Sequence, residues 1–196
     1  MKHAVIVAHP NPESLTASCA RAYAEAVEAG GGQALVRDLY RMGFDPCLKA
    51  EEIPGPRGYT IAEDVIAERA QLADVDVFAF VYPLWFNAPP AILKGYVDRV
   101  FSTDFGYRLT PSGAEPLLKG RKLVSFTFSG APDSWVRETG ALDALKSLLD
   151  RHLAAMCGLR VLDHVHAGGI GPGMRDDAAA DIIEAVRDWV RANAAG

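Results

Sequence analysis

The sequence predicts an α/β protein in which a parallel sheet of five strands carries helices on both faces. Short, β-branched apolar runs alternate five times with amphipathic helical patterns along the 196 residues. Strands that are apolar throughout are typical of a sheet covered on both sides. Parallel neighbours also need right-handed crossovers, which the helical patterns supply. Because the length suits one substantial core, we expect residues 1–196 to form a single domain.

Each predicted strand is an apolar run of strand length bounded by turn residues or by a helical pattern. The third run is the strongest, because all of its residues except one aspartate are apolar. The predicted strands are HAVIVA (3–8), QALVRDL (33–39), VDVFAFV (75–81), KLVSFTF (122–128) and RVLDHVH (160–166).

The predicted helices show apolar residues at intervals of three and four. They cover residues 15–29, 61–73, 91–101, 141–157 and 177–192. In the second of them we expect Ile61, Val65, Ile66 and Leu72 to face inward. Residues 41–59 are dominated by Gly and Pro and predict a long connection, and FGYRLT (105–110) predicts a small hairpin arm.

Composition excludes several classes of protein. The formal net charge of -5 argues against nucleic-acid binding, which normally needs a basic face. No apolar stretch approaches the roughly 20 residues of a membrane span, and the N-terminal run is too short for a signal peptide. Cys19, Cys47 and Cys157 lie at no metal-ligand spacing, so we expect no metal site and reduced thiols in a cytoplasmic protein.

In doubly wound sheets, ligands bind beyond the carboxyl ends of the strands, where the strand order reverses. The loop after the first strand, AHPNPESLTAS (8–18), contains neither a dinucleotide-binding glycine motif nor a P-loop. His9 closes the strand, and Ser14 and Thr16 open the helix, whose free N–H groups favour phosphate. Asn11 is an alternative N-cap with Pro12 at the first helical position, and we prefer Ser14. A plain capped helix without a ligand would give the same pattern.

Two further loops end strands of the predicted sheet. YPLWFNAPP (82–90) places Trp85 and Phe86 at an exposed strand end, where flat heteroaromatic rings would suit them. The alternative is that both aromatic rings pack into the core or a dimer interface. FTFSGAPDSW (126–135) supplies small residues that let backbone N–H groups approach a flat ligand closely.

These loops and their surroundings resemble one known family. YPLWFNAPPAILKGYVDRVF (82–101) followed by FGY (105–107) carries the most specific likeness. AHPNPESLT (8–16), DLYRMGFDP (38–46) and MCGLRVLD (156–163) fall in the expected order. The chain thus resembles the NAD(P)H:quinone oxidoreductase family of flavodoxin-like fold, which implies the strand order 2-1-3-4-5.

The resemblance implies a flavin cofactor, with FAD favoured and FMN possible, reduced by NAD(P)H. It also implies a homodimer, with Tyr107 and Trp135 in the substrate pocket, and ping-pong hydride transfer to quinones or similar acceptors. The residues implied to bind the flavin are His9, Ser14, Leu15, Thr16, Pro83, Leu84, Trp85, Phe86, Asn87, Thr127, Phe128, Ser129 and Gly130.

The chain departs from the family at the loop after the fourth strand. Residues 127–130 read T-F-S-G where better-studied members carry T-T-G-G, and Trp135 stands where they carry Tyr. No histidine lies between Phe128 and Leu149, so the family's Tyr/His pair is not carried over. We interpret His152, His164 and His166 as structural histidines, because their spacing lacks a third metal ligand. A regulatory ancillary subunit of a potassium-efflux system, or an azo- or nitroreductase, remains an alternative reading.

Overall fold

The computed structural model describes residues 1–56 and 58–193, built around one parallel five-stranded sheet. The sheet has the order β2-β1-β3-β6-β7, which confirms the predicted order 2-1-3-4-5. All seven residues of β3 are buried, as expected for a central strand covered on both faces. The strands are β1 (Lys2–Val7), β2 (Gln33–Asp38), β3 (Val77–Pro83), β6 (Lys122–Phe128) and β7 (Arg160–Ala167).

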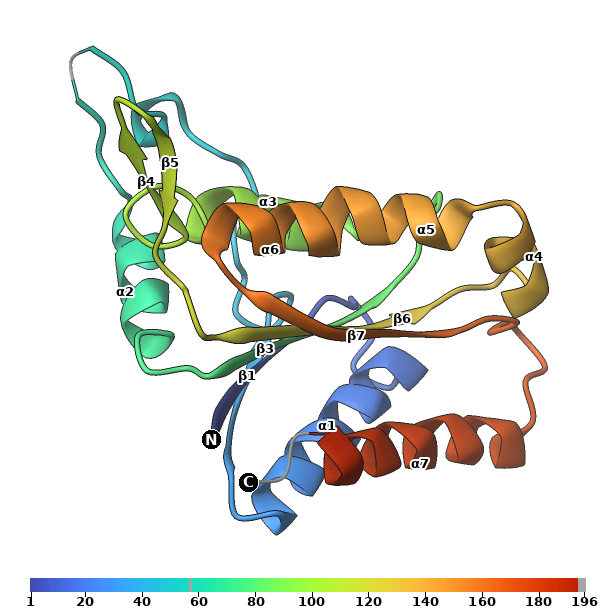
Figure 1. Ribbon diagram of the computed structural model, residues 1–196. Helices are drawn as coiled ribbons and strands as arrows, with labels where there is room; N and C mark the ends of the chain where they lie inside the picture. Colours follow the sequence, from blue (N-terminus) through green and yellow to red (C-terminus); the bar gives the residue numbers. More distant parts are fainter. Residues whose placement is uncertain (57, 194–196) are drawn as a thin grey trace.

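Helices cover both faces of the sheet (Figure 1). On one face lie α1 (Leu15–Ala29) and α7 (Asp176–Asn193), which pack on the inward side chains of β1, β3 and β6. On the other lie α2 (Glu63–Gln71), α3 (Ala91–Val100) and a helical layer over 141–157. The core is therefore two apolar layers separated by the sheet.

The helical layer over 141–157 is less regular than the sequence predicts. It consists of α5 (Ala141–Leu145), a π-helical segment η2 (Lys146–Arg151) and α6 (His152–Cys157). A stripe of leucines is nevertheless buried along this layer, namely Leu142, Leu145, Leu149 and Leu153. The short helix α4 (Asp133–Glu138) precedes it and begins inside the predicted loop 126–135.

The predicted hairpin arm is present as β4 (Tyr107–Thr110) paired antiparallel with β5 (Gly113–Pro116). The inward orientation predicted for Ile66 is wrong, since that side chain is 54% exposed. The inward face of α2 is instead completed by Glu68 and Arg69, which are buried. The pattern of apolar residues does not predict this inward face, because two charged side chains occupy core positions in it.

The described residues of the predicted long connection, 41–56 and 58–59, contain one 3₁₀ turn, η1 (Ala50–Glu52). Arg99 of α3 holds the connection in place by donating hydrogen bonds to Glu52, to Asp64 and to the Asp45 carbonyl. Gly95 allows α3 to pack closely against the connection, because a Cβ at this position would lie 2.1 Å from the Pro46 carbonyl oxygen.

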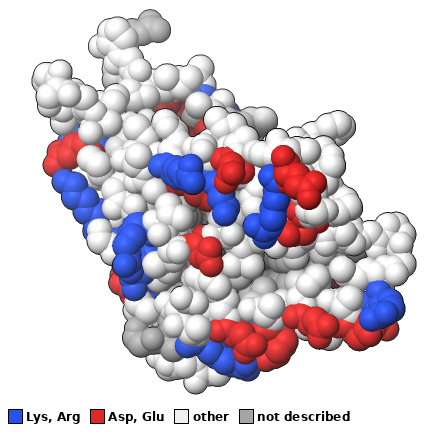
Figure 2. Space-filling view, turned by 45° about the vertical axis from the view of Figure 1, so that its right-hand side comes forward, with Lys and Arg blue, Asp and Glu red and all other residues white. Residues whose placement is uncertain are grey.

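The surface carries charges of both signs. Figure 2 shows basic and acidic side chains interspersed on the face in view, without a field of one sign. Along α7, for example, Glu184 pairs with both Arg187 and Arg191. In the part of the chain that the structure describes, no helix combines the length and apolar character needed to cross a bilayer.

Candidate functional site

The loop after β1 leads directly into the start of α1. Ser14 is the N-cap, and its Oγ accepts a hydrogen bond of 3.2 Å from the Ala17 amide, which confirms the preferred helix start. The first turn of α1 contains no acidic residue, so its free amides and the positive end of the helix dipole face outward unopposed. Burial lowers the pKa of His9, which favours a neutral ring that donates one N–H rather than a cation.

The loop after β3 is a tight turn that presents an aromatic ring to solvent. Trp85 and Ala88 exchange backbone hydrogen bonds of 3.0 and 3.1 Å. Between them Phe86 and Asn87 have φ angles of 50° and 55°, a left-handed conformation that non-glycine residues rarely adopt. Asn87 Nδ2 stabilises the turn by donating to the Ala141 carbonyl oxygen at 3.0 Å. As a result Phe86 is fully exposed, whereas Trp85 is 43% exposed and lies beside His9 with ring centroids 6.0 Å apart.

The loop after β6 is tied to the residues that follow β7. The Ser129 amide donates to the Ala167 carbonyl at 3.1 Å, and the Ile170 amide donates to the Ser129 carbonyl at 2.9 Å. A Cβ at Gly130 would lie 3.4 Å from the Ile170 carbonyl oxygen, which is an ordinary van der Waals contact. Because Ser129, Gly130 and Ala131 are all small, this part of the loop offers mostly backbone atoms as a wall.

These three loops enclose a cavity of about 220 Å³ at the carboxyl ends of β1, β3 and β6. The site residues predicted from the sequence contribute most of its wall, and Ile170 is an addition. The lining residues are His9, Ser14, Leu15, Thr16, Pro83, Leu84, Trp85, Phe128, Ser129, Gly130 and Ile170.

A second cavity of about 450 Å³ shares the Ser129–Gly130 wall with the first. It is lined by Phe86 and Asn87 of the aromatic turn and by Trp135 and Val136 of α4. The sequence pattern does not indicate Val136, because it does not predict α4, and Ala131 lies in the predicted loop 126–135 without any feature that marks it as a site residue. Among the described residues that line the two cavities, none is acidic.

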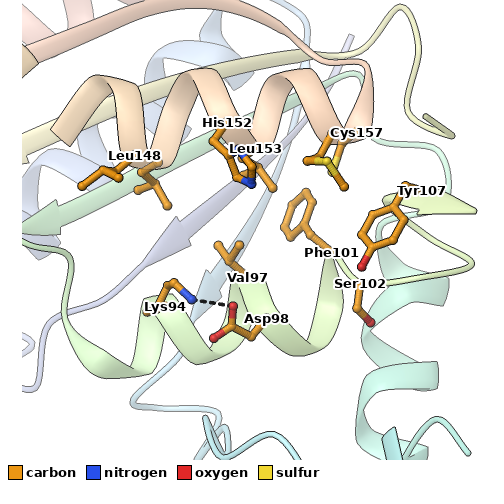
Figure 3. Close-up of a pocket in the computed structure, with 12 residues that line it drawn as sticks. Lys94, Val97, Asp98, Phe101, Ser102, Tyr107, Leu148, His152, Leu153 and Cys157 are labelled. Carbon is orange, nitrogen blue, oxygen red and sulfur yellow. Dashed lines mark hydrogen bonds and ion pairs between the residues drawn. The ribbon is translucent and has the colours of Figure 1, made fainter. Parts of the chain in front are cut away.

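Two predicted site residues line neither cavity. Thr127 is fully buried, and its Oγ1 lies 2.9 Å from His164 Nε2 and 2.9 Å from His166 Nδ1. Tyr107 lies instead in a groove of about 260 Å³ between α3 and the 146–157 layer. Figure 3 shows it across from Ser102 and near Phe101 and Cys157 in that groove.

The chemistry of the cavity fits a flavin. Free amides and the Ser14 and Thr16 hydroxyls at the start of α1 suit a phosphate group. Backbone, Trp85 and the exposed Phe86 ring suit one face of a flat heteroaromatic system. The absence of acidic side chains from the lining suits a ring that gains electrons there.

Fold and site together define a doubly wound α/β protein with a cavity at the point where the strand order reverses, which is where sheets of this kind bind ligands. A family model described as flavodoxin-like fold matches residues 1–192, and the chain belongs to this family.

Relatives and solved structures agree with that assignment. The chain is 34% identical over 174 residues to a protein of Haemophilus influenzae named uncharacterized NAD(P)H oxidoreductase, covering 87% of this chain and 85% of the relative. It is 26% identical to the NAD(P)H dehydrogenase [quinone] 1 of Cavia porcellus, over 90% of this chain and 72% of the relative. The structure of NAD(P)H:quinone oxidoreductase from Methanothermobacter marburgensis superposes with a TM-score of 0.83 at 28% identity, covering 97% and 94% of the two chains.

Proposed function

We propose that this protein is a flavin-dependent NAD(P)H oxidoreductase that reduces quinones or similar acceptors by ping-pong hydride transfer. The observation that carries the proposal is the cavity in which the start of α1, the aromatic turn and the Ser129–Gly130 loop converge. The oxidoreductase and quinone reductase names of the relatives support the same activity. Azo or nitro compounds would be other acceptors for the same chemistry.

The flavin supplies hydride chemistry when bound, and the protein supplies binding, orientation and electrostatics. Ser14, Leu15 and Thr16 would hold the phosphate and the chain attached to it. Residues 83–87 would lie along the ring, with Phe86 and Trp85 as its apolar contacts, and Ser129 and Gly130 would bound its polar edge. The second cavity, with Trp135 in its wall, has room for nicotinamide and acceptor in turn.

FAD is the cofactor we favour, with FMN as the alternative. The glycine-rich segment 168–173 adjoins the first cavity through Ile170, and it offers a backbone path for an adenylate group. Releasing the cofactor by heat and identifying it by chromatography distinguishes the two.

We further propose a cytoplasmic homodimer. All three cysteines are free thiols, as expected in a reducing compartment. Tyr107 lies in a groove separate from the flavin cavity, so it can help to enclose a substrate only across a subunit interface. That groove contains Val97, Phe101 and Leu148, and Leu148 is 79% exposed in the single chain. A second copy would cover this apolar surface.

Anaerobic stopped-flow mixing with NADPH tests the activity. We expect rapid bleaching of the flavin absorbance, re-oxidation on adding a quinone, and parallel lines in double-reciprocal plots. Protein stripped of its cofactor is the control. Flavin that stays oxidised in the presence of both NADPH and NADH would overturn the proposed function.

A further inference from the structure

A continuous line of polar side chains runs beneath the Ser129 wall of the cavity. β6 and β7 pair in the register Ser125 with His164 and Thr127 with His166, so these side chains share one face of the sheet. All six members are at least nine-tenths buried. In order, the line comprises Ser125, Asp150, His164, Thr127, His166 and Ser129.

The contacts along this line are all within hydrogen-bond distance. At its inner end Ser125 Oγ donates to Asp150 Oδ1 at 2.8 Å, and His164 Nδ1 lies 2.5 Å from Asp150 Oδ2. Thr127 Oγ1 bridges the two histidine rings at 2.9 Å on each side. At the outer end His166 Nε2 lies 3.1 Å from Ser129 Oγ.

The single proton of Thr127 fixes the direction of the bonds between His166 and Asp150 when both rings are neutral. With Asp150 as a carboxylate, His164 donates from Nδ1, so its bare Nε2 accepts the Thr127 proton. Thr127 then has no proton left for His166, which must donate from Nδ1. The bare Nε2 of His166 can accept the Ser129 hydroxyl proton, for which the Ala131 carbonyl oxygen is the other acceptor. The hydrogen bonds from His166 to Asp150 therefore point inward.

This arrangement can accept one more proton with a single hydroxyl rotation. Ser129 Oγ also lies 2.9 Å from the Ala131 carbonyl oxygen, a second acceptor already in place. If His166 gains a proton at Nε2, it donates to Ser129, and the Ser129 hydroxyl turns to Ala131. A proton shift through Thr127 then moves the positive charge to His164, beside the Asp150 carboxylate.

The groups around the line bear on this protonation. Burial lowers the pKa of His166; Asp133 opposes this, while His164, Arg137 and Lys146 add to it. Burial, and to a lesser extent the charge of Asp150, raise the pKa of Tyr82, which therefore stays neutral. The lowered pKa favours a neutral His166 ring at rest, and added negative charge nearby would favour its protonation.

We propose that the line from Ser129 to Asp150 is a proton relay, which takes one proton from water in the cavity when a cofactor bound there is reduced. The proton enters at His166 Nε2 and rests between His164 and Asp150, where it offsets the negative charge that reduction adds. His164, His166 and Thr127 act through Ser129 and are positioning residues. The inference rests on the proposed function for the source of that charge.

Histidine NMR of the cofactor-free protein tests the relay itself. We expect the His164 and His166 rings to titrate together as one step that binds one proton. Thr127→Val removes the bridging hydroxyl at nearly constant shape and should separate the two titrations, whereas Thr127→Ser should preserve their coupling. Independent titration in the unaltered protein, or no titration between pH 4 and 9, would overturn the relay.

The pH dependence of the reduction potential tests its link to the cofactor. We expect the unaltered protein and Thr127→Ser to bind one proton more per two electrons than Thr127→Val. One extra proton per two electrons makes the reduction potential of a two-electron couple fall by about 30 mV more for each pH unit. Ser129→Ala removes the hydroxyl at the outer end of the line and should give the same pH dependence as Thr127→Val. It provides the test if Thr127→Val fails to fold.

Equal slopes in all four proteins would defeat the proposal while leaving the proposed function intact. A protein that binds no flavin would defeat the proposed function, and the NMR titration would still decide whether the relay exists.

Discussion

Phe86 and Asn87 occupy a left-handed turn that costs conformational energy and gains nothing in the packing of the core. Both have positive φ, and the Phe86 ring contacts no apolar layer of the protein. Such strain, of the order of 1 kcal/mol per residue or more, is typically kept where the surroundings or a ligand use it. Here it places an aromatic ring at the second cavity, which shares Leu84 and the Ser129–Gly130 wall with the cavity proposed to hold the flavin.

Phe86→Ala should therefore weaken flavin binding more than Trp85→Ala. Covering an exposed Phe side chain stabilises a complex by about 1.5–3 kcal/mol, so its loss should raise Kd roughly 10- to 150-fold. Part of the Trp85 surface is already covered beside His9, so a flavin would cover less additional apolar area there. Fluorescence titration of the stripped protein with flavin measures both values.

Ile66→Ala is the matched control, because it removes an exposed apolar side chain of α2 that lines neither cavity. A larger loss from Trp85→Ala than from Phe86→Ala would show that the neighbouring ring makes the main contact.

At the level of single residues, the sequence could locate the cavity wall but not the relay beneath it. Ser14, Trp85 and Ser129 follow strands whose ends are visible in the apolar pattern. Thr127 was assigned to the same loop by resemblance, yet its side chain points into the protein. Its partners His164 and His166 lie almost 40 positions away, and only the register of β6 against β7 brings them together.

At the level of elements, the long connection depends on a single buried arginine. The Arg99 side chain is 2% exposed and contacts two carboxylates, those of Glu52 and Asp64. Burial acts to raise the pKa of Glu52, but the hydrogen bonds and charge of Arg99, together with hydrogen bonds from the Lys49 and Ala62 backbone, outweigh it and hold that pKa below its usual value. Arg99 is likewise the main cause of the lowered pKa of Asp64.

Arg99→Met should destabilise the fold by about 3–5 kcal/mol, because Glu52 is left buried without its partner. Carboxylates with depressed pKa values stabilise above their usual pKa, and this stabilisation is lost as the pH falls. The variant should therefore lose less of its remaining stability on acidification than the parent. Urea unfolding at pH 7 and pH 4 measures both effects.

Arg108→Met is the control, since its pair with Glu115 is exposed at 3.7 Å and should contribute less than about 1 kcal/mol. Equal losses in the two variants would contradict the role assigned to Arg99.

The existence and order of the main strands and helices could be predicted, because each buries a continuous apolar run or stripe. The exceptions have physical reasons. In α2, Glu68 takes an inward position because it pairs with Arg37 and accepts a hydrogen bond from Tyr96, which leaves Ile66 outside. The π-helical turns of η2 could not be predicted, since a stripe of buried leucines is compatible with both an α-helix and a π-helix.

At the level of the whole molecule, the groove beside Tyr107 is the surface that a second copy would cover. Figure 3 shows Leu148 and Val97 projecting toward the open groove, flanked by the Lys94–Asp98 ion pair at 2.6 Å. An apolar centre with a charged rim is the usual anatomy of a protein interface.

Leu148→Asp should weaken self-association at least tenfold, because the charge would be buried against apolar side chains. Sedimentation velocity over a range of concentrations measures the change. Ile66→Asp is the control, with the same substitution at an exposed apolar position outside the groove. A parent protein that is monomeric at every concentration would refute the homodimer.

The strand order also determines when during biosynthesis the cavity can exist. Its walls come from residues 9–16, 83–85 and 128–130 and from Ile170, so the chain must be synthesised beyond residue 170 before the last wall is in place. The cavity is therefore complete only after β7 has joined the sheet. The proposed flavin would accordingly bind late in folding and stabilise the folded state by mass action.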